Sequence, residues 1–234
     1  MLKRVLPALI AGAAWLACPA AQAQSASDCE GTAARAERKW ESSPLLERCA
    51  EAGHAASQAL LGMIYWGAST EEVCEDKVCT TGDPKSVKLD PSLTVRDMEK
   101  RGRHWLEAGA KNGNATAQNE LGHAYLAGEY GMPTDPVAAR PLLEKATDGG
   151  DDIAPFNLAQ IYLQGLGVPA SQETGERLLR MSVQRGYRAA RCTLEVILDR
   201  KNLLGASMEA MQMRAADTLK GLKCSDDDIM PGVN

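Results

Sequence analysis

Residues 117–125 read Ala-Gln-Asn-Glu-Leu-Gly-His-Ala-Tyr, and this stretch decides the fold. Leu121, Gly122 and Tyr125 stand at positions i, i+1 and i+4, which share one face of an α-helix. A glycine on that face lets a neighbouring helix approach closely, and the tyrosine fills the wider gap beside it. The stretch therefore predicts a helix that packs tightly against a partner helix.

The same pattern recurs along the chain at fixed distances from a glycine. A leucine stands eight residues after each of four glycines, and two large apolar residues begin eight residues before each of them. In three of the four units a small residue follows the leucine, and a tyrosine lies four residues after it. Such self-similarity predicts a repeat protein. The aligned glycines are Gly53, Gly113, Gly150 and Gly186, and the aligned leucines are Leu61, Leu121, Leu158 and Leu194.

Each unit is expected to be a helical hairpin with a tight turn at the glycine, which suits the left-handed backbone that ends a helix. One such hairpin buries its apolar face only by stacking on the next, so we expect an all-α fold of about five hairpins. Two helices should begin with an N-cap followed by proline, at Asp90-Pro91 and at Asp135-Pro136. The predicted helices span residues 30–41, 44–52, 54–66, 91–112, 114–127, 135–148, 152–164, 170–185, 187–200 and 206–222.

Residue by residue, the pattern resembles the Sel1-like repeat, a relative of the tetratricopeptide repeat. Residues 105–113, 117–125 and 154–162 carry the match, and the steps between the last three aligned glycines are 37 and 36 residues, the usual length in that family. The resemblance covers roughly residues 30–200. It implies a right-handed α-α superhelix that binds another protein.

Two departures from the repeat affect the domain boundaries. The step from Gly53 to Gly113 is 60 residues, about 24 too long, and the excess is an inserted loop over residues 67–90 that is rich in Thr, Asp, Glu and Lys. The last unit loses the small residue and the tyrosine, as a capping repeat would. We expect a solenoid over residues 24–225 and a flexible acidic tail over residues 226–234.

Residues 1–23 have the form of a secretory signal peptide, with a basic start, an apolar run and the cleavage pattern Ala21-Gln22-Ala23. The apolar run is shorter than the roughly 20 residues that span a bilayer. We therefore expect a chain that is exported to the periplasm. The alternatives are a retained membrane anchor and a lipid anchor on Cys18.

Six of the seven cysteines remain after cleavage, and an even number in an exported chain predicts disulfides. The repeat register brings the ends of each terminal hairpin together, so both terminal hairpins should be stapled. Within the insertion, a disulfide is favoured over a zinc half-site. The predicted pairs are Cys29–Cys49, Cys192–Cys224 and Cys74–Cys79.

The sequence shows no motif for catalysis or metal binding. His54, His104 and His123 have no partner at metal-ligand spacing, and His54 stands where it would cap a helix or face water. Neither a Gly-x-Ser-x-Gly motif nor a phosphate-binding glycine loop occurs. We expect no catalytic residue, no cofactor and no metal. A hydrolase of cell-wall-related substrates is the enzymatic alternative.

The charge of the chain bears on its partners. The formal charge of −5 becomes −7 when two basic residues leave with the signal peptide, which disfavours binding to nucleic acid. We also expect no membrane insertion of the mature chain. The partner that remains is another protein.

One stripe of side chains is the candidate surface for binding a partner protein. The first helix of each hairpin presents residues near the seventh, tenth and fourteenth positions after the glycine, and in a solenoid such stripes align across the concave wall. Amides together with a methionine and a tryptophan suit protein recognition. The inserted loop is a second candidate surface. The candidate binding residues are Met63, Trp66, Glu120, His123, Asn157, Gln160 and Gln164.

Taken together, these features predict a non-enzymatic, periplasmic protein-binding module. For an exported protein of this kind, the resemblance implies one of three roles. The first is immunity or inhibition directed at an effector that acts in the periplasm, and we rank it first because the chain is a small single module. The second is regulation of an envelope signalling protein, and the third is scaffolding of a polysaccharide-export or other envelope complex.

Overall fold

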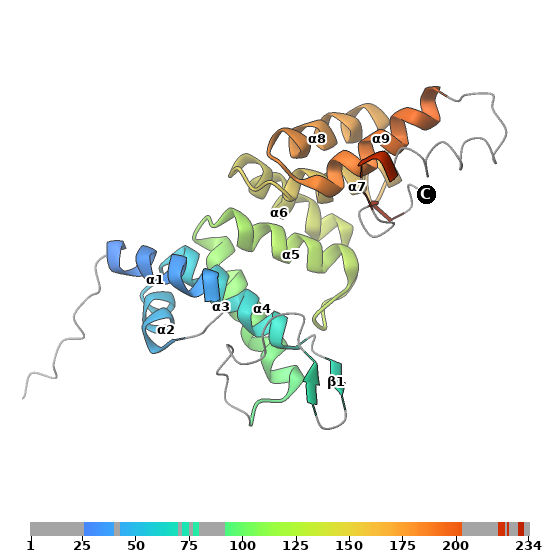
Figure 1. The fold of residues 1–234 in the computed structure, drawn as a ribbon. Coiled ribbons are helices and arrows are strands. Elements are labelled where there is room, and N and C mark those ends of the chain that lie inside the picture. Colours follow the sequence, from blue (N-terminus) through green and yellow to red (C-terminus); the bar gives the residue numbers. More distant parts are fainter. Residues whose placement is uncertain are drawn as a thin grey trace, which may run out of the picture.

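The computed structural model describes residues 26–39, 43–69, 72–74, 77–79, 92–202, 220–222, 224 and 229–231. These residues form an elongated stack of antiparallel helical hairpins that runs from the N-terminal to the C-terminal part of the chain (Figure 1). The predicted helical superhelix is therefore confirmed. The predicted signal peptide lies outside the described residues. In the described part, no helix is long and apolar enough to cross a membrane.

Nine helices lie in the described residues, and they alternate between the first and the second helix of a hairpin. We call them A and B helices. Each observed boundary lies within about four residues of the predicted one, and most of the tenth helix, predicted at 206–222, lies outside the described residues. The A helices are α1 (Ala26–Lys39), α3 (Ala55–Ser69), α5 (Ala115–Ala127), α7 (Ala154–Gln164) and α9 (Arg188–Asn202). The B helices are α2 (Pro44–Glu51), α4 (Val95–Lys111), α6 (Pro136–Asp148) and α8 (Gln172–Gln184).

Side chains that bind free backbone amides set the helix starts. At the start of α6, Asp135 accepts two backbone N–H bonds of 3.0 Å, so the predicted N-cap there is confirmed. The N-cap predicted at Asp90 is wrong, because α4 begins four residues later than expected. Thr94 and Asp97 form a capping box at that point, which satisfies two amides at once.

The hairpins close through contacts that only small residues permit. A Cβ atom on Gly62 would lie 2.5 Å from the Cγ of Leu106, and one on Gly122 would lie 2.7 Å from the Cγ of Leu143. Any side chain at either glycine would push the A helix away from its B helix. The glycines of this column are thus points of close contact between the two helices in the α3–α4 and α5–α6 hairpins.

The A helices form the inner side of the stack. Consecutive A helices touch one another, α1 with α3, α3 with α5 and α5 with α7, whereas consecutive B helices meet less closely. Since one side of the array is more tightly spaced than the other, the stack bends toward the A helices. The inner side is therefore the A-helix side, as the repeat pattern predicts.

The insertion is not the plain loop that was predicted over residues 67–90. Helix α3 extends to Ser69, and β1 (Glu72–Cys74) pairs in antiparallel fashion with β2 (Lys77–Cys79) to form a small hairpin (Figure 1). The side chains of Cys74 and Cys79 lie outside the described part of the chain. Their disulfide stays a prediction.

Both predicted terminal disulfides are present. Cys29 bonds to Cys49 with their Cα atoms 5.5 Å apart, and Cys192 bonds to Cys224 with a Cα separation of 6.1 Å. The first bond joins the two ends of the N-terminal hairpin, and the second joins α9 to Cys224, which follows it in the chain. Since a terminal hairpin stacks on one neighbour only, a covalent closure of about 3 kcal/mol helps to hold it folded.

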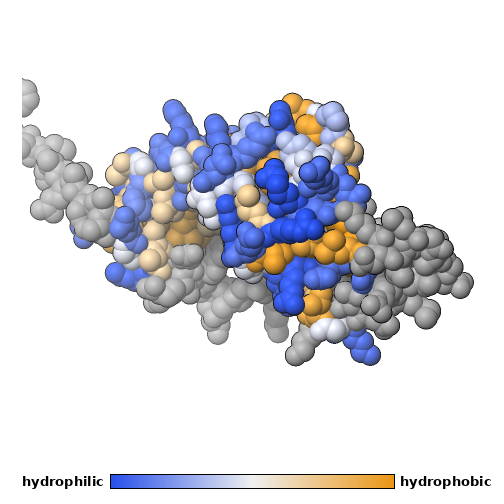
Figure 2. All heavy atoms as spheres, turned by 90° about the horizontal axis from the view of Figure 1, so that it is seen from above, coloured by the Kyte–Doolittle hydropathy of each residue, from blue (hydrophilic) through white to orange (hydrophobic). Residues whose placement is uncertain are grey.

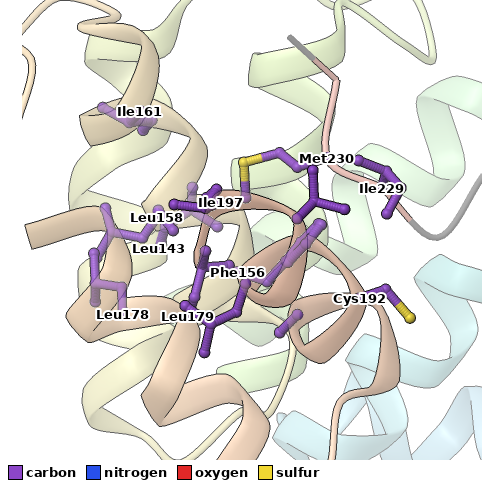
Figure 3. Close-up of a cluster of buried hydrophobic side chains, with 14 of the residues drawn as sticks. Leu143, Phe156, Leu158, Ile161, Leu178, Leu179, Cys192, Ile197, Ile229 and Met230 are labelled. Carbon is purple, nitrogen blue, oxygen red and sulfur yellow. The ribbon is translucent and has the colours of Figure 1, made fainter. Parts of the chain in front are cut away.

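The flexible tail predicted over residues 226–234 is wrong for its described residues, 229–231. Ile229 and Met230 are buried in the largest hydrophobic cluster of the described residues, which contains side chains of α6, α7, α8 and α9 (Figure 3). Burial of these two side chains stabilises the folded chain, because a large apolar side chain contributes about 1.5–3 kcal/mol when it is removed from water.

A test of the close helix packing is the substitution Gly102→Ala in α4. A Cβ atom there would lie 2.1 Å from the Cδ1 of the buried Trp66, which has no free volume into which to move. We expect the free energy of unfolding to fall by about 1–3 kcal/mol in urea denaturation.

The matched control is Gly31→Ala in α1. A Cβ atom on Gly31 meets nothing within 4 Å, so this variant should be neutral or up to about 1 kcal/mol more stable. Equal effects of the two substitutions would contradict the packing described for Trp66.

Candidate functional site

The A helices carry a line of side chains along the inner side of the stack. Positions one before, two after and six after the aligned leucine lie within about 60° of one another around a helix. We call the residues at these positions in α3, α5 and α7 the inner stripe. They are Leu60, Met63, Gly67, Glu120, His123, Ala127, Asn157, Gln160 and Gln164.

Five of the predicted binding residues lie together at the surface of this stripe. Met63, Glu120, His123 and Gln160 are partly exposed, and Gln164 is exposed. They come from three consecutive A helices that contact one another. The structure thus brings them to one accessible surface, and their role in binding stays a prediction.

Asn157 was wrongly placed among the accessible residues. Only 4% of its surface is exposed, because its Nδ2 donates a 2.9 Å hydrogen bond to Oδ1 of Asn119 in the neighbouring A helix. A buried amide pair of this kind satisfies polar groups that would otherwise be costly to bury. Asn157 therefore joins α5 to α7 and is not free to contact a partner.

Trp66 was also wrongly placed on the binding surface. It lies four residues after Gly62, about 40° around the helix from it and so on the side of α3 that faces α4, and it is 2% exposed. Its indole stacks on the ring of Tyr130 with the centroids 4.1 Å apart, and its Nε1 donates to the backbone oxygen of Glu99 at 3.1 Å. Trp66 belongs to the packing between α3 and α4.

The three central inner helices are poor in charged residues, whereas the outer helix α4 is rich in them. Helices α3 and α7 contain no Asp, Glu, Lys, Arg or His, and α5 contains only Glu120 and His123. In contrast, α4 on the outer side carries eight Asp, Glu, Lys or Arg residues. Figure 2 shows one side of the molecule, where hydrophilic surface dominates and the hydrophobic surface gathers toward the C-terminal repeats.

Glu120 is the one carboxyl of the inner stripe. Burial raises its pKa to about 7, together with the negative charges of Asp151 and Glu129. The Nδ2 of Asn119 donates a 3.4 Å hydrogen bond to Glu120, which offsets part of this effect. Near neutral pH this carboxyl gains and loses a proton easily, and a positive group brought beside it would hold it ionised.

The other ionisable member of the stripe is His123. Its Nδ1 lies 3.8 Å from Oε2 of Glu129, and both side chains are nearly half exposed. An exposed pair at this distance contributes little to stability. His123 is thus available to a partner without loss of an important internal contact.

A cleft of about 220 Å³ opens on the inner side next to the stripe. It lies between α1, α3 and α5, and its lining is mostly apolar. The sequence pattern missed this cleft because α1 lies outside the aligned repeats. The lining residues are Ala33, Ala56, Ala59, Leu60, Met63, Asn114 and Thr116.

The remaining histidines have local structural surroundings. His54 precedes α3, and its Nδ1 accepts the backbone N–H of Ser57 at 3.3 Å, so the predicted capping is confirmed. His104 is exposed and makes an edge contact with the ring of Trp105. In the described residues, no group of three or more His, Cys, Asp or Glu side chains could hold a metal ion.

The model of the Sel1 repeat family matches three consecutive pieces of the chain, residues 93–114, 115–151 and 154–187. These pieces contain α4 to α8 and the turns between them. The chain contains three Sel1 repeats. Sel1 repeats form protein-interaction modules, so the chain has the architecture of a repeat module for binding proteins.

Two solved structures are similar to this chain. One is the Sel1 repeat protein from Oxalobacter formigenes, with 22% identity, a TM-score of 0.48 and coverage of 64% of this chain and 94% of that chain. The other is c5321, a protective antigen present in uropathogenic Escherichia coli strains, which displays an SLR fold. It is 22% identical with a TM-score of 0.50, and the match spans 67% of this chain and 28% of that one. This likeness concerns the fold alone. A search of curated proteins found no match.

The raised pKa of Glu120 makes a prediction about stability. The folded chain binds a proton at Glu120 that the unfolded chain releases between about pH 4.5 and pH 7, so the free energy of unfolding falls as the pH rises through that range. Glu120→Gln does not titrate. The free energy of unfolding of the variant minus that of the parent should therefore be larger at pH 8 than at pH 4.5. The increase should be at most about 3 kcal/mol, measured by urea denaturation.

Glu107→Gln is the control, because Glu107 is an exposed carboxyl on the outer helix α4. It should leave the pH dependence of stability as it is in the parent. The account of Glu120 is contradicted if Glu120→Gln differs from the parent by the same amount at pH 4.5 and at pH 8.

Proposed function

We propose that this chain is an exported, non-enzymatic protein-binding module that holds part of another protein along its inner stripe. The observation that carries the proposal is the charge-poor surface of α3, α5 and α7 beside the heavily charged α4. The cores of protein interfaces are depleted in charge and enriched in methionine and aromatic residues. Met63 matches that enrichment, and Gln160 and Gln164 are uncharged.

The accessible members of the stripe would act differently on a partner. Met63 lines the apolar cleft, where a flexible thioether adapts its shape to an inserted apolar side chain. The amides of Gln160 and Gln164 both donate and accept hydrogen bonds, so they suit backbone groups of a bound segment. Glu120 favours a partner that brings a lysine, an arginine or an N–H group to it.

We place this binding in the periplasm, after removal of residues 1–23. Cys29–Cys49 and Cys192–Cys224 support export, because disulfides persist in oxidising compartments. An array stapled at both ends presents a preorganised surface, which lowers the entropy lost on binding. Such a surface suits the inhibition of one partner, and the proposed role is that of an inhibitor or immunity protein against an effector that acts in the periplasm.

The test is an affinity pull-down from periplasmic extract with the disulfide-intact mature chain. A variant with Met63, Glu120, His123, Gln160 and Gln164 changed to alanine should lose a partner that the parent retains. If these residues form the centre of the interface, their loss costs at least about 2 kcal/mol, or roughly 30-fold in Kd.

The matched control changes five exposed residues of the outer helices to alanine. It should retain the partner, and the helical circular dichroism of both variants should equal that of the parent. A partner lost by the outer variant and kept by the inner one would contradict the proposed binding surface. The control residues are Arg96, Lys100, Gln172, Glu173 and Arg177.

A further inference from the structure

The C-terminal segment Ile229–Pro231 lies against the last two A helices. Ile229 is 5% exposed and Met230 is fully buried, and both belong to the cluster that contains Phe156 of α7 and Ile197 of α9. Figure 3 shows the two side chains within that cluster, with Met230 beside Ile197. A segment from beyond the repeats therefore fills an apolar surface that the repeats create.

This surface is the continuation of the inner stripe into α9. Thr193 and Val196 stand one before and two after the aligned leucine, the positions of Glu120 and His123 in α5. Glu120 and His123 are partly exposed, whereas Thr193 and Val196 are 0% and 1% exposed. Val196 is thus buried at a position where His123 and Gln160, two repeats and one repeat earlier, are open to solvent.

Side chains of the stripe bind the backbone of the segment. The Oγ1 of Thr193 accepts the N–H of Met230 at 3.0 Å, and the Nε2 of Gln164 donates to the backbone oxygen of Pro231. Backbone hydrogen bonds together with buried apolar side chains are the way in which grooves bind peptides. Backbone groups are the same in every sequence, so these contacts would serve another segment equally well.

The segment is tethered next to its site. Cys224 is bonded to Cys192 in α9, and Ile229 follows it by five residues. A short tether gives an effective concentration on the order of millimolar, so even a weak intramolecular contact is populated. Occupation of the surface by the chain itself therefore does not require high intrinsic affinity.

We propose that the inner face of α7 and α9 is a peptide-binding site that the chain's own Ile229–Pro231 occupies. Its ligand class is a short segment with two adjacent large apolar residues, and a partner that carries one binds by displacing the C-terminal segment. This inference rests on the proposed function, since it assigns the C-terminal part of the inner face to the same partner. It adds the ligand class and the competition with the chain's own segment.

The experiment compares the full mature chain with the variant Ile229→Ser/Met230→Ser, whose segment no longer fills the site. The probe is a fluorescein-labelled peptide with the sequence of residues 225–234, Ser-Asp-Asp-Asp-Ile-Met-Pro-Gly-Val-Asn, titrated by fluorescence anisotropy. The variant should bind the peptide, and the parent should bind it at least about tenfold more weakly because its tethered segment competes. A peptide with serine at both apolar positions is the matched control and should not bind the variant.

A folded variant that binds no peptide would overturn the proposal, because Ile229–Pro231 would then be a fixed part of the core. Equal binding to the parent and the variant would overturn it too, since the peptide would sit elsewhere. If the variant does not fold, hydrogen exchange of the parent decides. The amide of Met230 should exchange at least about 100-fold faster than that of Ile161 in α7, and equal protection would contradict a displaceable segment.

The outcome is separable from that of the pull-down. Absence of peptide binding, together with a partner that needs Met63, Glu120 and His123, would overturn this inference and leave the proposed function in place. If the peptide binds but the partner is retained by the inner-stripe variant, this inference stands and the proposed binding surface for the partner is wrong.

Discussion

The structure depends on the contact between a small residue of each A helix and a buried leucine of its B helix. Gly62 against Leu106 and Gly122 against Leu143 leave no room for a Cβ atom. This close approach makes each hairpin thin, so consecutive A helices touch along one side of the stack. The inner stripe exists because that contact recurs at each repeat. The three central inner helices, α3, α5 and α7, carry few charged side chains, whereas α4 on the outer side carries eight Asp, Glu, Lys or Arg residues.

Much of this arrangement follows from sequence spacing. The aligned residues of the repeats predict the nine helices of the described residues to within about four residues of their observed bounds. They do so because each hairpin must repeat the same packing in order to stack on the next. The register also predicts both terminal disulfides, since antiparallel helices bring the ends of a hairpin together. The same columns predict that Met63, Glu120, His123, Gln160 and Gln164 share a surface.

What spacing did not predict depends on contacts between separate parts of the chain. Trp66 was placed on the binding surface, but its position four residues after Gly62 turns it toward α4, and its partner Tyr130 comes from a later loop. Ile229 and Met230 follow three aspartates that favour a solvated tail, yet both side chains are buried against residues of α7 and α9. The raised pKa of Glu120 needs Asp151 and Glu129, which no local pattern places beside it.

We propose that this repeat protein binds another protein at its inner face. The most direct test of this proposal is photo-crosslinking in cells that export the chain, with benzoylphenylalanine at Gln160 of the inner stripe or at Lys100 of the outer helix α4. We expect a discrete adduct with one protein from position 160 and none from position 100. Adducts from position 100 alone would contradict it.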